Sequence, residues 1–198
     1  MEIKDFPKIK SPFIRRGDNF LVTPEIDEEL RWVFEDDSVT CQEKLDGTNV
    51  SIVIENGKIT RVFNRKNEED IWKNSPIMLA VRESYNKGYC RFEDGQYFGE
   101  AIGEKIQGNN YNIRGNIWLP YDTYFKKHLT YKSWGKYPKD FKTISDWFKD
   151  LMPLFALSIG QKNGFVEGVV FHHPDGRMAK LRRDMFDWYN GKRHKQNN

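Results

Sequence analysis

Residues 50–63 carry the pattern that most limits what this chain can fold into. Apolar side chains occupy every second position of residues 50–54, as in a strand. Asn56-Gly57 follows, and this pair favours a two-residue hairpin turn because both positions need a positive φ. Residues 59–63 continue in a second run. The pattern predicts two antiparallel strands joined by a tight turn.

Further apolar runs predict more strands, at residues 97–102, 165–171 and 178–181. A loop rich in glycine and asparagine follows the first run at 107–110. The turn-forming sequence His173-Pro174-Asp175-Gly176 separates the other two runs, which therefore form a second antiparallel pair.

Two segments have a helical pattern. Residues 67–87 carry partial apolar signals and end before Gly88, which suits the position after a helix. A second helix starts near Thr143, where Thr143 and Asp146 resemble a capping box, and Pro153 should kink or split it. Since hairpins dominate, we expect an α+β fold of antiparallel sheets flanked by helices.

The composition sets the class of protein. A length of 198 residues suits one domain, and 15% aromatic residues predict a core rich in rings. A net charge of +3 is too small to demonstrate a nucleic-acid partner. Two cysteines form neither a disulfide framework nor a metal-site spacing. With no signal-peptide core or long apolar span, we expect a cytoplasmic protein with no membrane partner.

We expect residues 1–198 to form a single domain with three parts. Residues 1–38 are a polar lead-in broken by prolines, with a helical turn near 28–32. Residues 39–183 carry the motifs described next and include an insertion at 119–160. Residues 184–198 form a basic tail.

The sequence Glu43-Lys44-Leu45-Asp46-Gly47-Thr48-Asn49 is the central candidate for chemistry. A lysine that attacks phosphorus must be unprotonated, so it needs the lowered pKa that burial and neighbouring cations supply. Gly47 lets a ligand approach the backbone closely. The alternative is a surface turn with an ordinary solvated lysine.

Two glutamates, Glu100 and Glu167, interrupt otherwise apolar strands. A carboxylate in such a strand is unfavourable unless it has a partner. For Glu100 that partner is a ribose hydroxyl or, alternatively, an internal arginine. For Glu167 it is a metal ion or the surroundings of a nucleotide or, alternatively, a structural ion pair.

Lys180 and Arg182 lie two positions apart in the last predicted strand and therefore point to the same face. Two cations on one face can bind the charge of a phosphate. The alternative is a solvated basic edge strand, which protects a sheet against aggregation.

The order of these motifs is more informative than any one of them. Lys-x-Asp-Gly, Gly-Glu, Glu-Gly-Val-Val and Lys-x-Arg succeed one another between residues 39 and 183. This succession resembles the covalent nucleotidyltransferase superfamily of polynucleotide ligases and mRNA capping enzymes. The sequences around Lys44 and after Glu100 are most similar to the RNA ligase 2-like group of ATP-dependent RNA ligases. The resemblance implies a nucleotidyltransferase (ATP-grasp-like) ligase core, and the chain has no room for an OB-fold after it.

The resemblance implies roles for the residues of the first motif and for an arginine beyond it. Lys44 matches the lysine that forms a covalent bond with AMP. Glu43 and Leu45 match positions that line the adenine site, and Asn49 matches an asparagine implicated in sealing. Arg65 matches an arginine that contacts the nucleotide sugar region, although Asn64 departs from the usual serine or threonine before it.

The later motifs complete the implied site. Glu100 matches the glutamate that binds the ribose hydroxyls, and Glu167 matches the acid tied to the catalytic metal. Lys180 and Arg182 match the cation pair on the α-phosphate. The usual pair is Lys-x-Lys, and Arg182 binds phosphate but cannot act as a proton donor at neutral pH.

The family also stacks an aromatic ring on the adenine. Trp118 is the residue that we expect in this role, with Tyr121 as the alternate. Pro120 is unfavourable in a central strand, and the alternative for Trp118 is an aromatic core residue.

The resemblance implies a three-step reaction with ATP and Mg²⁺ or Mn²⁺. Lys44 takes AMP from ATP, the AMP passes to an RNA 5′-phosphate, and a 3′-hydroxyl then displaces it and closes the strand. The alternatives are a stand-alone adenylyltransferase, a GTP-using capping-type enzyme, and a degenerate nucleic-acid-binding domain. We expect a monomer, with a separate partner as one source of substrate specificity.

Two basic segments are candidates for gripping RNA. In the insertion, lysines alternate with aromatic residues, a composition suited to backbone contact and base stacking. The alternative is that the rings pack onto the core and the lysines are merely solvated. The lysines and arginines concerned are Lys8, Lys10, Arg15, Arg16, Lys126, Lys127, Lys132, Lys136, Lys139 and Lys142, and the aromatic residues are Tyr124, Tyr131, Trp134 and Tyr137.

Overall fold

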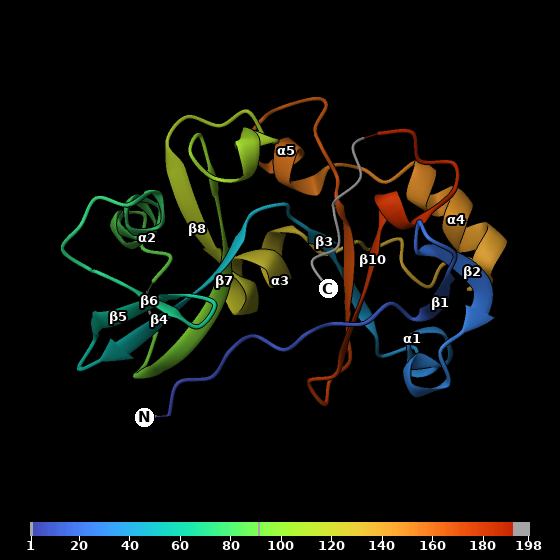
Figure 1. The fold of residues 1–198 in the computed structure, drawn as a ribbon, viewed down its shortest axis with the longest axis horizontal. Helices are drawn as coiled ribbons and strands as arrows, with labels where there is room; N and C mark the ends of the chain where they lie inside the picture. The colour runs from blue at the N-terminus through green and yellow to red at the C-terminus, as the bar shows by residue number, and fades with distance from the viewer. Residues whose placement is uncertain (1, 91, 192–198) are drawn as a thin grey trace. The chain divides into compact units, whose positions relative to one another are not determined.

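The computed structural model describes residues 2–90 and 92–191, and the basic residues 192–195 of the expected tail lie outside them. The chain divides into two compact units, which are described separately below (Figure 1). The single domain over residues 1–198 stays a prediction. Unit 1 comprises Met1–Lys8, Leu45–Leu129 and Phe155–Phe165, and unit 2 comprises Ile9–Lys44, Thr130–Leu154 and Val166–Asn198.

Unit 1 is built on a five-stranded sheet in the order β6-β5-β4-β7-β8, in which every pair of neighbours is antiparallel. Pro120 ends β8, which is an edge strand, so its missing N–H removes no hydrogen bond from the sheet interior. The strands are β4 (Thr48–Glu55), β5 (Lys58–Asn64), β6 (Asn67–Glu69), β7 (Gly95–Gly103) and β8 (Asn116–Pro120).

The hairpin predicted from residues 50–63 is confirmed. β4 and β5 pair in antiparallel register, and Asn56 and Gly57 form the turn with φ values of 53° and 69°. The carboxylate of Asp94 accepts hydrogen bonds from both turn amides, at 2.9 Å from Asn56 and 3.1 Å from Gly57. The turn is therefore held by a side chain as well as by its own conformation.

The helix expected over residues 67–87 is shorter in the structure. Residues 67–69 form β6, and helix α2 spans Pro76–Asn86. Ser75 caps α2 by accepting a hydrogen bond from Met78 N, and proline is well suited to the first helical position. Gly88 has a φ of 77°, which confirms its position after the helix. α2 packs against β8, and the core of unit 1 combines apolar side chains of α2 with those of the five-stranded sheet.

Four short helical segments complete unit 1. They are η2 (Gln107–Asn109), η3 (Tyr121–Phe125), α3 (Lys126–His128) and α5 (Leu154–Ser158). Pro153 directly precedes α5, so the split expected at this proline is confirmed.

Unit 2 is built on a three-stranded antiparallel sheet in the order β10-β9-β3, formed by β3 (Thr40–Lys44), β9 (Gly168–His172) and β10 (Met178–Arg182). The β1–β2 hairpin (Phe13–Arg16 and Leu21–Ile26) and four helical segments surround it. The helical segments are η1 (Glu28–Leu30), α1 (Trp32–Glu35), α4 (Phe141–Lys149) and η4 (Arg183–Met185). The expected lead-in therefore contributes folded elements to this unit.

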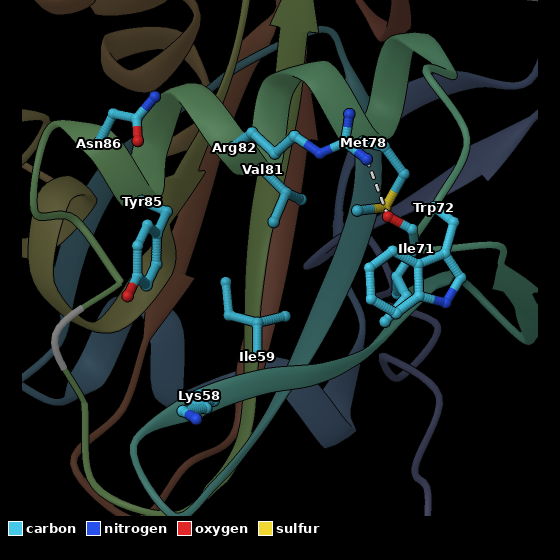
Figure 2. A pocket seen from close by; sticks show the side chains of 9 residues that line it. All are labelled: Lys58, Ile59, Ile71, Trp72, Met78, Val81, Arg82, Tyr85 and Asn86. Atoms are coloured by element: carbon cyan, nitrogen blue, oxygen red, sulfur yellow. Dashed lines mark hydrogen bonds between the residues drawn. The ribbon is translucent and has the colours of Figure 1, made fainter.

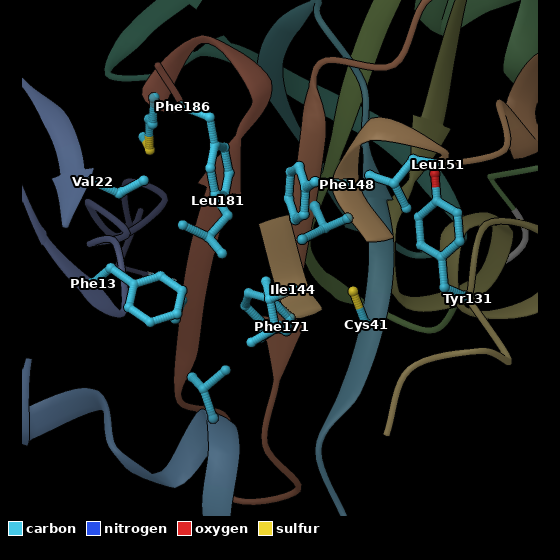
Figure 3. Close-up of a cluster of buried hydrophobic side chains, with 14 of the residues drawn as sticks. Phe13, Val22, Cys41, Tyr131, Ile144, Phe148, Leu151, Phe171, Leu181 and Phe186 are labelled. Atoms are coloured by element: carbon cyan, nitrogen blue, oxygen red, sulfur yellow. The ribbon is translucent and has the colours of Figure 1, made fainter. Parts of the chain in front are cut away.

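One face of the β10-β9-β3 sheet is covered by an aromatic-rich core, shown in Figure 3. The side chains of Cys41, Phe171 and Leu181 have no exposed surface, and they alternate along their strands with polar or partly exposed residues. Ile144 and Phe148 of α4 complete this packing. The helix begins earlier than expected, because Asp140 and not Thr143 is its cap and accepts a hydrogen bond from Thr143 N at 2.9 Å.

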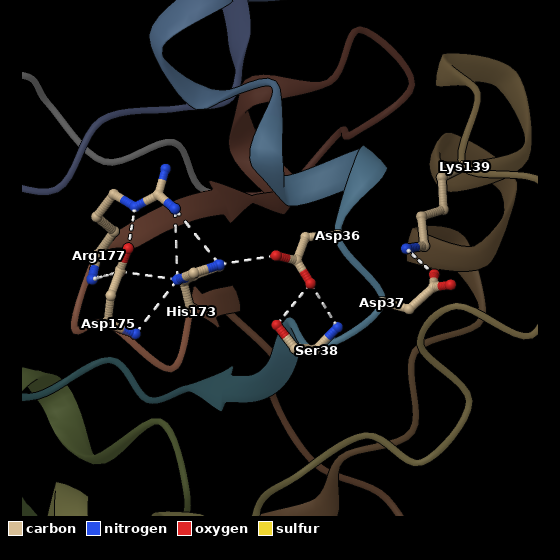
Figure 4. Close-up of polar contacts among 7 residues, drawn as sticks. All are labelled: Asp36, Asp37, Ser38, Lys139, His173, Asp175 and Arg177. Atoms are coloured by element: carbon tan, nitrogen blue, oxygen red, sulfur yellow. Dashed lines mark hydrogen bonds and ion pairs between the residues drawn. The ribbon is translucent and has the colours of Figure 1, made fainter.

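The turn between β9 and β10 is fixed by a cluster of charges (Figure 4). His173 lies between two carboxylates, with Nε2 2.8 Å from Asp36 Oδ2 and Nδ1 2.8 Å from Asp175 Oδ1. Arg177 pairs with Asp175 and lies over the ring of Trp32. The hydrogen bond to Asp36 raises the pKa of His173, while backbone and side-chain hydrogen bonds lower the pKa of Asp175 to about 2.

The expected α+β class, with antiparallel sheets flanked by helices, is confirmed. Among the residues that the structure describes, no helix has the length and apolar character needed to span a bilayer.

Candidate active site

In unit 2, the pairing of three strands brings Lys44, Gly168 and Arg182 into one row. Lys44 of β3 is opposite Gly168 of β9, and Arg182 of β10 is opposite Gly168 on its other side. Residues paired directly across a sheet point to the same face, and so do residues two apart in one strand. Lys180 therefore shares this face with Lys44 and Arg182.

The side chain of Lys44 reaches a buried acid. Its Nζ forms an ion pair and hydrogen bond with Glu167 Oε2, and the Glu167 side chain is 5% exposed. The backbone carbonyl of Glu167 accepts a hydrogen bond from Arg183 N at 2.9 Å, which extends the β9–β10 pairing to this residue. Strand pairing thus joins two residues that are 123 positions apart in the sequence.

Lys180 lies in a crowded positive environment. Burial lowers its pKa to about 8, and the charges of Lys44 and Arg182 act in the same direction. The negative charge of Glu167 acts against them. A phosphate placed beside these cations would relieve their mutual repulsion, so this face favours an anion.

Arg15 of β1 is a cation that the sequence did not assign to this group. Its pKa is lowered by burial and then by the charge of Arg182, while Asp184 acts in the opposite direction. Asp184 also forms an ion pair with Arg182, Oδ1 to Nε at 3.1 Å. No local sequence pattern indicates this arrangement, because β1 lies far from β10 along the chain.

Gly168 sits at the crowded centre of the row. A Cβ added there would lie 2.1 Å from the carbonyl oxygen of Leu181, and real Cβ atoms do not approach so closely. The Glu-Gly sequence therefore meets a packing requirement as well as a chemical one.

Glu43 does not share the face of Lys44. It alternates with Lys44 along β3, lies opposite Val169 and has no exposed surface. Its charge contributes to the raised pKa of Tyr131, whose main cause is burial. The Glu43 side chain thus lies on the core-facing side of the sheet. If Glu43 lines the adenine site as expected, it can do so only through its backbone atoms.

In unit 1, Asn49 and Glu100 form a second group of polar residues. They are directly opposite each other in β4 and β7, so both point to one face of the sheet. Glu100 Oε1 accepts a hydrogen bond from Gly47 N at 3.1 Å. The donors to the Glu100 carboxylate include this backbone amide and the phenol of Tyr121.

Tyr121 connects these two residues. Its hydroxyl donates a hydrogen bond to Glu100 Oε2 and accepts one from Asn49 Nδ2 at 3.1 Å. Its ring packs against Phe6 and Phe125, at centroid distances of 5.2 Å and 4.9 Å. The sequence pointed to Tyr121 only as an alternate ring for the adenine, and this bridging role was missed.

Trp118 occupies the opposite face of the same sheet. It pairs with Ala101, the neighbour of Glu100, so alternation turns its ring away from Glu100. The ring has no exposed surface, and its Nε1 donates to the Val50 carbonyl at 3.0 Å. A fully buried ring has no face to offer to a base, which fits the alternative of a core residue.

Two motif glycines make room for neighbouring groups. A Cβ on Gly99 would lie 2.6 Å from the ring of Trp118, and one on Gly47 would lie 2.3 Å from the carbonyl oxygen of Ala101. The sequence predicts that Gly47 lets a ligand approach the backbone. The close approach of Ala101 is sufficient by itself to require a glycine at this position. Leu45, expected at the adenine, is 1% exposed.

Arg65 follows β5 in a left-handed conformation with a φ of 55°, which is uncommon for arginine. Its backbone N–H donates to the Asn49 carbonyl at 3.3 Å, so the two expected site residues are adjacent. The guanidinium is 57% exposed and lies 3.9 Å from a carboxylate oxygen of Asp5.

Glu167 is the residue at which a metal ion is expected. Within residues 2–90 and 92–191, no three of these groups come together as a metal-binding cluster. Mg²⁺ commonly binds through one or two carboxylates together with water and phosphate oxygens. The single carboxylate of Glu167 fits that kind of site and does not fit an all-protein metal cage.

The aromatic residues of the insertion mostly pack inward. Tyr131 is buried, and Trp134 and Tyr137 lie against the core of unit 2. This supports the alternative that these rings stabilise the fold. Exposed lysines surround these rings, and two of the insertion lysines form ion pairs, Lys139 with Asp37 and Lys142 with Asp146. The exposed ones are Lys126, Lys127, Lys132, Lys136 and Lys142.

Residues 37–188 match the family model described as RNA ligase. No curated protein matches the chain in sequence.

Solved structures of an RNA ligase from Naegleria gruberi have a similar fold. A variant with ATP and Mn shares 17% identity, with a TM-score of 0.57 over 88% of this chain and 59% of that one. The same ligase with PPi shares 19% identity, with a TM-score of 0.55 over 91% of this chain and 58% of that one. The chain thus spans about three fifths of the length of these ligases. At this identity the likeness establishes the fold.

Proposed function

The chain belongs to the RNA ligase family, and on that premise we propose that it joins RNA ends through a covalent intermediate in which AMP is attached to Lys44. The observation that carries the proposal is the position of Lys44 Nζ against the buried carboxylate of Glu167, on a sheet face shared with Lys180 and Arg182. An amine that can act as a nucleophile, a carboxylate and two cations that can bind phosphate support this proposal.

In the first step, Lys44 Nζ attacks the α-phosphorus of ATP. An N–P bond forms, the bond from the α-phosphorus to the bridging oxygen breaks, and pyrophosphate leaves. Lys44 must first lose a proton, because an ammonium has no lone pair. Lys180 and Arg182 balance the negative charge that the phosphates bring, and a cation pair of this kind needs no rearrangement during the reaction.

A divalent metal has a place in this scheme at Glu167. When bound, Mg²⁺ or Mn²⁺ would neutralise phosphate charge and compete with Lys44 for the Glu167 carboxylate. Glu167 holds Lys44 by its charge in the structure, so any cation that binds this carboxylate weakens the hold on the lysine. The ATP, AMP and Mn named for the Naegleria gruberi ligase structures agree with this choice of substrate and metal.

The polar group of unit 1 supplies the sugar contacts in our proposal. Glu100 is oriented by Gly47 and Tyr121 and would accept hydrogen bonds from ribose hydroxyls. Arg65 is exposed beside Asn49 and would contact the sugar region. Asn49 then serves the last two steps, in which AMP passes to an RNA 5′-phosphate and a 3′-hydroxyl displaces it.

Covalent labelling tests the proposal. The purified chain, incubated with α-labelled ATP and Mg²⁺ or Mn²⁺, should retain label after denaturation, and α-labelled GTP should give none. Lys44→Ala should abolish the label, whereas Lys10→Ala, at an exposed lysine of the same unit, should leave it unchanged. Label that persists in Lys44→Ala refutes the assignment of the nucleophile, and label from GTP alone indicates a capping-type enzyme.

Joining is measured separately with adenylylated enzyme and 5′-phosphorylated RNA. A nick and a single strand are both tried, and joined product is expected on one of them. Accumulation of adenylylated RNA without joining would identify a stand-alone adenylyltransferase. Equal joining of DNA 3′-hydroxyl ends would contradict the choice of RNA while leaving the chemistry of Lys44 intact.

A further inference from the structure

Unit 1 contains a pocket that the proposed reaction does not use. It has a volume of about 410 Å³ and lies between α2 and the β5 end of the sheet (Figure 2). Ile59, Val81 and Met78 supply apolar walls, and Trp72 and Tyr85 lie at opposite ends. Its size falls in the range of pockets that bind small organic groups, roughly 300–1,000 Å³.

Trp72 is unusual because its ring is exposed while its backbone is fixed. The residue is 86% exposed, the highest value among the exposed large apolar residues. Its N–H donates to Asp70 Oδ1 at 3.0 Å. The guanidinium of Arg82 donates to the carbonyls on either side of it, at 2.8 Å to Ile71 and 3.1 Å to Lys73. The ring is therefore presented on a rigid turn, which lowers the entropy lost on binding.

Tyr85 presents a second accessible ring. It lies on α2, one helical turn after Val81, and is 54% exposed. Two exposed rings with apolar side chains between them, as Figure 2 shows, can stack on or pack around a flat aromatic group. A flat ligand would cover surface on both rings that water now contacts.

The charge of the pocket indicates what kind of flat group fits. Lys58 and Arg82 contribute two positive charges, and none of the described residues that line the pocket is acidic. The side-chain amide of Asn86 adds a donor and an acceptor at the Tyr85 end. Rings for stacking, a lysine for phosphate and an amide for a base edge are the elements of single-strand nucleic-acid binding. Arg82 adds positive charge while its guanidinium holds the turn that carries Trp72.

We propose that this pocket binds an unpaired base of the RNA strand whose end the site joins, with the base stacked on Trp72. The inference rests on the proposed function for the identity of the strand. The pocket holds the RNA strand whether or not ATP is bound. It lets unit 1 contact RNA outside the proposed nucleotide site.

The test measures binding of a fluorescent, 5′-phosphorylated single-stranded RNA to the full chain by anisotropy, without ATP. Trp72→Ala should weaken binding roughly 5- to 150-fold, the loss of one base stack. Trp72→Phe keeps a ring and should recover most of the affinity. Leu79→Ala is the control. It removes a partly exposed apolar side chain of α2 that does not line the pocket, and the affinity for RNA should stay unchanged.

A strand of the same length without bases separates stacking from charge. It should bind more weakly than RNA, and Trp72→Ala should not weaken it further. Equal affinity of the unaltered chain and Trp72→Ala for normal RNA would overturn the inference, as would an equal loss with the abasic strand. AMP is also added as a competitor. If AMP displaces the RNA at concentrations that match the affinity of the chain for AMP alone, the pocket binds free nucleotides and not a strand.

The labelling assay keeps the two proposals apart. Trp72→Ala should still be labelled by α-labelled ATP as the unaltered chain is, and a loss of label would mean that the substitution disturbs the fold or the nucleotide site. Absence of label in the unaltered chain would refute the proposed function alone, because the anisotropy measurement requires no ATP.

Discussion

Removing the hydroxyl of Tyr121 should weaken both the fold of unit 1 and its use of ATP. Tyr121→Phe keeps the ring and therefore its packing on Phe6 and Phe125. It deletes the hydrogen bond to the carboxylate of Glu100 and the one from Asn49. The substitution thus tests the bridge without creating a cavity.

The size of the effect follows from the partners. A hydrogen bond to a charged group contributes about 1.5–3 kcal/mol, and a neutral one about 0.5–1.5 kcal/mol. Glu100 is 8% exposed, so water replaces the lost donor poorly, although Gly47 still donates to it. We expect a loss of about 2 kcal/mol in the free energy of unfolding, or about 4–8 °C in Tm for a chain of this size.

The catalytic consequence is separable from the structural one. Glu100 and Asn49 lose their orientation, so the ATP concentration needed for half-maximal labelling should rise roughly 5- to 30-fold, equivalent to about 1–2 kcal/mol. Tyr124→Phe is the matched control. Tyr124 lies three positions after Tyr121 in the same helical segment, and its hydroxyl contacts Ser158 and not Glu100 or Asn49. That control should leave the ATP dependence unchanged.

Melting curves and labelling over a range of ATP concentrations are the two assays. Circular dichroism confirms that the variant is folded at the assay temperature. An unchanged Tm together with an unchanged ATP dependence would falsify the bridging role of Tyr121. A lowered Tm with unchanged ATP dependence would make the hydroxyl purely structural.

Two further predictions concern unit 2. Gly168→Ala places a Cβ 2.1 Å from the carbonyl oxygen of Leu181, so strands β9 and β10 must separate, and urea denaturation should show a loss of about 3 kcal/mol or more. The pKa of His173 is raised by Asp36, so its contribution to stability is complete below pH 6.5 and is lost as pH rises through the raised value. His173→Gln should remove that fall in stability, and an unchanged pH profile would show that the cluster does not contribute.

Local rules determined a large part of this fold. The β4–β5 hairpin follows from alternation and from Asn56-Gly57, because a two-residue turn depends on its own φ values. The end of α2 at Gly88 and the break at Pro153 follow for the same reason. The start of α2 was also encoded locally, in Ser75 and Pro76, but residues 67–69 were drawn into a strand by pairing with β5.

The sequence also determined which residue types carry the chemistry and in what order. The motif pattern alone indicates five candidates, which are Lys44, Glu100, Glu167, Lys180 and Arg182. The match to the RNA ligase family model covers residues 37–188 and so includes all five of these positions. Their roles in the reaction stay proposals that the labelling experiments test.

Only the tertiary structure decided which of these residues meet and which face each one occupies. The pairing of Lys44 with Glu167 depends on the alignment of β3 with β9, 123 residues along the chain. Trp118 faces the core and Tyr121 reaches Glu100 because the register of β7 and β8 sets which side chains share a face. A shift of one residue would exchange those faces, and the packing of buried side chains from distant segments, which no local pattern encodes, selects the register.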